Sequence, residues 1–101
     1  IPSFCAAAAR MNIGLVEKAE PLHVIPASYQ IEAALKLPGT KVLMKAGKKM
    51  QEVKKQLLQM ENTETLMIEN CGMPGEKLYR GAEEIPETAG DYSLIIVKEK
   101  E

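Results

Sequence analysis

A short apolar strand that ends in a glycine-rich turn is the clearest place for chemistry in this chain. Residues 65–69 are mostly apolar, and the turn that follows contains Cys71, Gly72 and Met73. Glycine lets backbone N–H and C=O groups approach a planar heterocycle closely enough to form hydrogen bonds with its edge. Met73 stands between glycine and proline, where packing in an ordinary core is not expected. The pattern favours a small-molecule site contacted by backbone atoms of the turn.

A second apolar strand, at residues 41–46, also ends at a glycine. Met44 and Lys45 stand near its end, shortly before Gly47. Lys45 is a candidate functional residue because a charged side chain has little reason to stand at the end of an apolar strand. Open α/β sheets place their ligands where strands run into such turns. We therefore expect the chain to form one half of a two-part active site.

No set of side chains for acid–base, nucleophilic or metal chemistry stands out in the sequence. Cys5 and Cys71 lie far apart without a CxxC spacing, which supports neither a disulfide framework nor a metal site. His23 has no cluster of metal-ligating residues around it and is expected at a surface or strand edge. The remaining charged clusters are interpreted as solvated faces: Glu83, Glu84 and Glu87, and Lys48, Lys49, Lys54 and Lys55. We expect no catalytic side chain and no metal.

The elements that must position the two strand ends alternate between helices and strands. Alanine-rich or amphipathic patterns predict helices at about 3–11, 29–37 and 48–59. Strands are predicted at 22–25, 41–46, 65–69, 76–80 and 92–97, the last being strongly β-prone. Residues 82–90 are expected to form a surface loop or a single helical turn. This order indicates an α/β sandwich with a mixed sheet.

Composition narrows the class of protein. A length of 101 residues fits one domain, and an apolar content of 46% excludes intrinsic disorder. With 13 basic and 14 acidic residues the net charge is −1, which gives no electrostatic footprint for nucleic acid. The apolar runs fall far short of the ~20 residues of a membrane span, and no signal peptide is recognisable. We expect a cytoplasmic protein with no nucleic-acid or membrane partner.

Four segments carry a resemblance to a known family. They are residues 1–10 (IPSFCAAAAR), 23–27 (HVIPA), 40–47 (TKVLMKAG) and 69–76 (ENCGMPGE). In these segments the chain resembles the C-terminal half of a tetrapyrrole methylase, the S-adenosylmethionine-dependent family of cobalamin and sirohaem synthesis. The Val-Leu-Met-Lys and Gly-Met-x-Gly-Glu pieces are most similar to the members that methylate carbon 20 of precorrin-2 or cobalt-precorrin-2.

The resemblance implies a domain organisation and a set of cofactor contacts. In that family the cofactor lies in a cleft between two α/β domains, so residues 1–101 would be the C-terminal domain. The N-terminal domain, with its Gly-x-Gly-Pro-Gly-Asp loop, would be missing, and the start of the chain within a motif agrees with this. A homodimeric enzyme is also implied. The implied cofactor contacts are Pro2, Ser3, Met44, Lys45, Cys71, Gly72 and Met73.

The resemblance also implies the reaction. S-adenosyl-L-methionine would give its methyl group directly to a nucleophilic carbon of the macrocycle and leave as S-adenosyl-L-homocysteine. The protein would mainly align the two reactants, which requires neither a nucleophilic residue nor a metal. Two positions depart from the family pattern: Pro2 stands where members often have Gly-Val-Ser or Gly-Ile-Thr, and relatives outside the subfamily often carry Met in place of Lys45.

A second interpretation is a free-standing α/β module that binds a small ligand or dimerises. The β-prone run of residues 92–97 would then pair with a second copy as a sheet edge. The start of the chain inside a motif favours the first interpretation.

Overall fold

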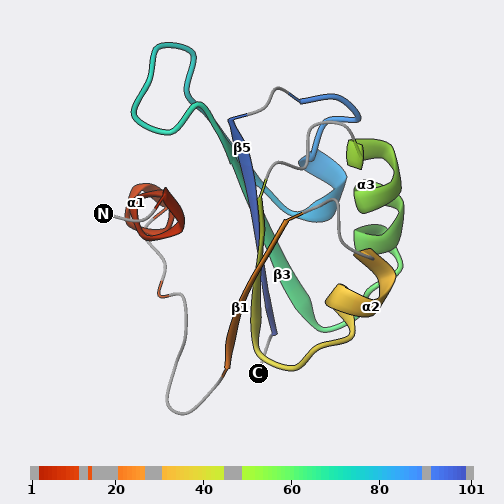
Figure 1. Ribbon diagram of the computed structural model, residues 1–101. Coiled ribbons are helices and arrows are strands. Elements are labelled where there is room, and N and C mark those ends of the chain that lie inside the picture. Colours follow the sequence, from red (N-terminus) through yellow and green to blue (C-terminus); the bar gives the residue numbers. More distant parts are fainter. Residues whose placement is uncertain are drawn as a thin grey trace.

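In the computed structural model the chain forms a mixed sheet with helices on both faces (Figure 1). The structure describes residues 3–11, 14, 21–26, 31–44, 49–89 and 92–99. The helices are α1 (Ser3–Met11), α2 (Ile31–Leu35) and α3 (Met50–Leu58), with a 3₁₀ turn η2 (Ala82–Glu84). The strands are β1 (Leu22–Pro26), β2 (Thr40–Met44), β3 (Thr63–Glu69), β4 (Lys77–Arg80) and β5 (Ser93–Glu99). Helix α1 covers one face, and α2 and α3 cover the other (Figure 1).

Each predicted helix and strand has a counterpart within this described part of the chain. The predicted single turn after residue 82 is the 3₁₀ turn η2. Strands β3 and β5 extend about two residues beyond the predicted runs at one end. Three predicted boundaries lie outside the described residues. The start of the second helix falls within 27–30, and the end of the second strand and the start of the third helix fall within 45–48.

The sheet has the strand order β1-β2-β5-β3-β4. Strands β1 and β2 are parallel, and the other neighbouring pairs are antiparallel, which confirms the predicted mixed sheet. The prediction that the terminal strand forms a sheet edge is wrong, because β5 lies between β2 and β3 and pairs with both. The physical reason is visible in β5 itself: residues 93–97 are all buried, as in a strand covered on both faces.

Two apolar clusters fix the helices to the sheet. On the face of α2 and α3, Leu43, Met67 and Ile95 are buried with residues of those helices. On the other face, Val42, Leu66 and Ile96 pack against α1. The α1 residues that reach this second cluster are Ala7, Ala8 and Met11. Because alanine has a short side chain, the helix can lie close to the strands, and its position across the sheet is well determined.

The charged residues mostly lie where the sequence analysis expects them. Glu83, Glu84 and Glu87 are exposed, as are Lys49 and Lys55, and Lys54 is partly buried; Lys48 lies outside the described residues. His23 is partly buried on β1, an outer strand of the sheet, which confirms its predicted edge position. Its Nε2 atom is buried and has no hydrogen-bond partner.

Lys41 is the exception, since among the described residues it is the buried charged side chain, at 1% exposure. Its Nζ donates hydrogen bonds to the carbonyl oxygens of Leu37 and Gly39, both at 2.9 Å. These bonds satisfy carbonyl groups in the connection between α2 and β2 and so fix the start of β2. Burial lowers the pKa of Lys41, and the nearby charge of Glu99 opposes this only in part.

Replacing Lys41 by Met should change how stability depends on alkaline pH. The lowered pKa means that, between it and the ordinary lysine value of 10.5, the unfolded chain binds more protons than the folded chain. The free energy of unfolding of the unaltered chain therefore rises with pH through this window, relative to the Lys41→Met variant. Urea unfolding of both proteins from neutral pH to just above the ordinary lysine pKa measures the difference. A difference that stays constant would contradict the assignment.

Candidate functional site

The carboxyl ends of β2 and β3 lie at the same end of the sheet. Both strands are antiparallel to β5, and both reach its first residues: Met44 and Ile68 each pair with Leu94. The two strand ends that the sequence singled out, each followed by a glycine turn, therefore lie at the same end of the sheet. Met44 and Cys71 also pack, partly buried, against the same apolar cluster beneath α1.

The predicted contacts differ in how far the structure describes them. Met44, Cys71, Gly72 and Met73 are described, and they come from the two strand ends. Ser3 is the first residue of α1. Pro2 and Lys45 lie outside the described residues. The structure thus brings together the end of β2 and the turn after β3, and α1 packs on one side of them.

The turn after β3 has an unusual backbone. Asn70, Gly72 and Gly75 have positive φ angles of 53°, 74° and 84°. The Met73 amide donates to the Asn70 carbonyl at 2.9 Å, and the Glu76 amide donates to the Met73 carbonyl at 3.2 Å. At the base, the Asn70 amide donates to the carbonyl of Tyr92 at 2.9 Å. The turn is thus a defined conformation that ordinary side chains at Gly72 would strain.

At the exposed part of this turn, the amides of Gly72 and Met73 are occupied and carbonyl oxygens are free. Within the described part of the chain, the carbonyl oxygens of Cys71 and Gly72 accept no hydrogen bond. A Cβ at Gly72 would have nothing within 4 Å, and the Met73 side chain is 45% exposed. Of the backbone groups expected to meet a ligand, the N–H groups of Gly72 and Met73 are thus occupied, whereas the carbonyl oxygens of Cys71 and Gly72 and the Met73 side chain remain open.

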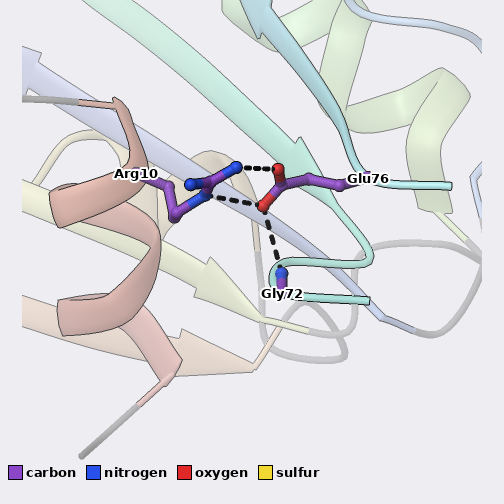
Figure 2. A network of polar contacts seen from close by, with 3 residues as sticks. All are labelled: Arg10, Gly72 and Glu76. Carbon is purple, nitrogen blue, oxygen red and sulfur yellow. Dashed lines mark hydrogen bonds and ion pairs between the residues drawn. The ribbon is translucent and has the colours of Figure 1, made fainter. Parts of the chain in front are cut away.

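An ion pair joins the turn to α1 (Figure 2). The Arg10 Nε donates to Glu76 Oε1 at 2.9 Å, and its Nη2 donates to Oε2. The same Oε1 accepts the Gly72 amide at 3.1 Å. The hydrogen bond from Arg10, followed by that from Gly72, lowers the pKa of Glu76, and the Glu76 carboxylate raises the pKa of Arg10. The contact therefore favours the charged form of both side chains.

Sequence reasoning missed this pair. Glu76 falls within the Gly-Met-x-Gly-Glu piece that carries the resemblance, but no role followed from its type. Arg10 is the first charged residue after an alanine run, and 66 positions separate the two residues. The signal that was available is the position of Glu76 directly after a turn of three left-handed residues, where a carboxylate can accept backbone amides.

The described residues contain no group of three or more histidine, cysteine, aspartate or glutamate side chains that could hold a metal ion. No helix among them is long and apolar enough to cross a membrane. The site thus lies at one end of the sheet, at the carboxyl ends of β2 and β3. It offers apolar side chains and carbonyl acceptors, and one ion pair lies beside it.

Comparison with known sequences gives a family. The sequence model of the Tetrapyrrole (Corrin/Porphyrin) Methylases matches residues 1–86. No curated protein matches the chain by sequence.

Solved structures share the fold. A cobalt-precorrin-4 methyltransferase is 17% identical with a TM-score of 0.74, covering 97% of this chain and 49% of its own. Uroporphyrin-III C-methyltransferase from Thermus thermophilus, complexed with S-adenosylhomocysteine, is 16% identical with a TM-score of 0.68, covering 97% and 49%. Precorrin-6Y methylase from Archaeoglobus fulgidus is 21% identical with a TM-score of 0.63, covering 100% and 47%. The predicted α/β fold is confirmed, and the chain spans about half the length of these structures.

Two glycines allow a test of how tightly the turn is enclosed. Gly72 and Gly39 both have positive φ, but a Cβ at Gly39 would lie 2.2 Å from the Pro21 carbonyl oxygen, whereas Gly72 is open. Gly72→Ala should lower the free energy of unfolding by about 1 kcal/mol, from backbone strain alone. Gly39→Ala adds a backbone collision and should cost about 3 kcal/mol or more. Urea unfolding measures both, and equal losses would show that the turn is not open.

Proposed function

This chain belongs to the tetrapyrrole (corrin/porphyrin) methylases, and we propose that it is the C-terminal domain of an S-adenosylmethionine-dependent enzyme of cobalamin synthesis. The observation that carries the proposal is the meeting of two strand ends, at Met44 and at the turn after β3, on one edge of the sheet. Both are the segments through which the sequence resembles the family. Open α/β sheets bind their ligands at the carboxyl ends of strands.

The open groups of the site suit the adenosine part of the cofactor. The exocyclic amine of adenine is a hydrogen-bond donor, and the open carbonyl oxygens of Cys71 and Gly72 are acceptors. The side chains of Met44 and Met73 offer apolar, polarisable surface for the flat ring. We assign Pro2, Ser3 and Lys45 to the same site from the resemblance. A fold neighbour with S-adenosylhomocysteine bound supports this choice of ligand.

The chemistry follows from binding and alignment. S-adenosylmethionine, when bound, supplies a methyl group on a positively charged sulfur. The residues of this chain hold the cofactor by one side, orient it and keep water from that side. Fixing two reactants in line is itself a large contribution to rate. The described residues at this edge provide contacts of that kind.

The proposed substrate is precorrin-2 or cobalt-precorrin-2, methylated at carbon 20. Its support is the similarity of residues 42–45 and 72–76 to that branch of the family. Fold neighbours that act on other corrin precursors are in keeping with a tetrapyrrole substrate. Because the chain spans about half of the neighbours' length, we propose that a preceding domain completes the cleft and that the whole enzyme is a homodimer.

Catalysis should require more than this chain. The full-length protein that contains it should methylate precorrin-2 or cobalt-precorrin-2 at carbon 20, while residues 1–101 alone fold without turnover, since half of the cleft is missing. Mass spectrometry and NMR of the tetrapyrrole product test this. Methylation of uroporphyrinogen III in place of precorrin-2 would overturn the substrate assignment, and turnover by residues 1–101 alone would overturn the domain assignment.

Binding of S-adenosylhomocysteine to the full-length protein should depend on Gly72. A Cβ there would enter the open space in front of the turn, so Gly72→Ala should weaken binding about tenfold or more, as expected for blocked hydrogen bonds. Gly81→Ala is the matched control. Gly81 has φ of 95° and ψ of 145°, a conformation almost confined to glycine, and it lies at the other end of β4.

Isothermal titration gives affinity, and thermal unfolding gives stability. We expect Gly81→Ala to lose at least as much stability as Gly72→Ala but to keep its affinity. Should the two variants lose affinity in proportion to their loss of stability, Gly72 would be a turn glycine and not part of the site.

A further inference from the structure

We propose that Arg10 and Glu76 are positioning residues, whose ion pair holds the turn after β3 so that the Cys71 carbonyl and the Met73 side chain face the ligand. This inference rests on the proposed function, because it concerns the same site. Neither residue is argued to touch the ligand. Their effect is exerted through the backbone of residues 70–76.

The turn needs an external contact to fix its direction. The bonds from Met73 to Asn70 and from Glu76 to Met73 lie within the turn, so they determine its shape only. Among the described residues, the polar contacts that join the turn to the rest of the protein are the Asn70 amide at its base and the Arg10–Glu76 pair. Figure 1 shows the turn extending beyond the end of the sheet, beside α1. The ion pair is therefore what holds the extended part.

The Glu76 carboxylate orients one peptide unit in particular. It accepts two hydrogen bonds from the Arg10 guanidinium and a third from the Gly72 amide (Figure 2). The peptide bond between Cys71 and Gly72 is trans. In a trans peptide the N–H and C=O point in opposite directions. By taking the Gly72 N–H, the carboxylate turns the Cys71 carbonyl away from itself, as an open acceptor.

The other end of the contact is itself fixed. Helix α1 is buried against the sheet through Ala7, Ala8 and Met11. In addition, Arg80 Nη2 on β4 donates to the Met11 carbonyl at 2.6 Å. Arg10 thus projects from a helix that is held to the sheet by apolar packing and by a hydrogen bond at its last residue. A guanidinium fork matches a carboxylate in geometry as well as in charge.

The ion pair between Lys36 and Glu32 serves as a comparison, because it is a surface contact without a positioning role. Lys36 and Glu32 are 3.7 Å apart, with 77% and 69% of their side chains exposed. In the other pair Arg10 is 57% exposed, but Glu76 is only 18% exposed and its carboxylate has a third donor from the backbone. Exposed pairs contribute little to stability. The Lys36–Glu32 pair is therefore a suitable control.

The test measures S-adenosylhomocysteine affinity by isothermal titration, together with hydrogen exchange of the Gly72 amide, in the full-length protein. Arg10→Met should weaken binding about threefold to tenfold, and Glu76→Met about tenfold or more because it also releases the Gly72 amide. Glu76→Gln keeps an oxygen for that amide, so it should recover part of the affinity and slow the exchange relative to Glu76→Met. Lys36→Met should leave both measurements unchanged.

Each outcome decides for or against the inference. Affinities of Arg10→Met and Glu76→Met equal to that of the unaltered protein, with the ligand bound by all three, would overturn the positioning role and leave the proposed function standing. Failure of the unaltered protein to bind S-adenosylhomocysteine would overturn both. Equal losses of affinity in Glu76→Gln and Glu76→Met would also overturn the positioning role, because the hydrogen bond to the Gly72 amide would then have no effect on binding. If Arg10→Met does not fold, Arg10→Lys keeps the charge without the fork and should still bind about threefold more weakly.

Discussion

The position of β5 in the middle of the sheet is the constraint on which the site depends. Both neighbours of β5 are antiparallel to it, so β2 and β3 run in the same direction although they are not adjacent. Their carboxyl ends therefore lie at the same end of the sheet, with β5 between them. Residues 93–97 can occupy this position because they are buried on both faces, under α1 on one side and under α2 and α3 on the other. If β5 lay at an edge, it could not pair with both β2 and β3, and this pairing would no longer place their carboxyl ends at the same end of the sheet.

Much of this could be predicted from the sequence. The apolar runs at 42–44 and 66–68 determine their strands without help from distant residues, and the glycines after them indicate where each strand ends. The run of residues 94–97 also carried information on its place, because four consecutive apolar residues are typical of a strand that is covered on both faces. Its β propensity alone did not distinguish the centre of a sheet from the edge, and the edge interpretation was wrong for that reason.

The contacts that hold the turn were not predictable in this way. Arg10 and Glu76 are 66 positions apart, and either residue taken alone reads as an ordinary surface charge. Their meeting depends on where α1 lies across the sheet, which is set by the packing of alanines and Met11. Lys41 presents the same difficulty: its type and neighbours resemble those of exposed lysines, and only the carbonyl groups of Leu37 and Gly39 give it a place inside. Local sequence patterns determine the individual helices and strands, whereas an ion pair between distant residues depends on how those helices and strands pack together.

The polarity of the turn also bears on the kind of ligand that this edge can hold. Sites for phosphate groups present backbone N–H groups, often at a helix N-terminus, because the ligand is an anion. Here the amides of Gly72 and Met73 are already taken by Glu76 and Asn70, and carbonyl oxygens remain. Carbonyl oxygens carry partial negative charge, so they suit donors and positive charge. A cofactor that has an amine-bearing ring, a cationic sulfur and no phosphate matches such an edge. The Glu76 carboxylate thus has two consequences at once, because it fixes the turn and it occupies the Gly72 amide, a donor that would suit an anion.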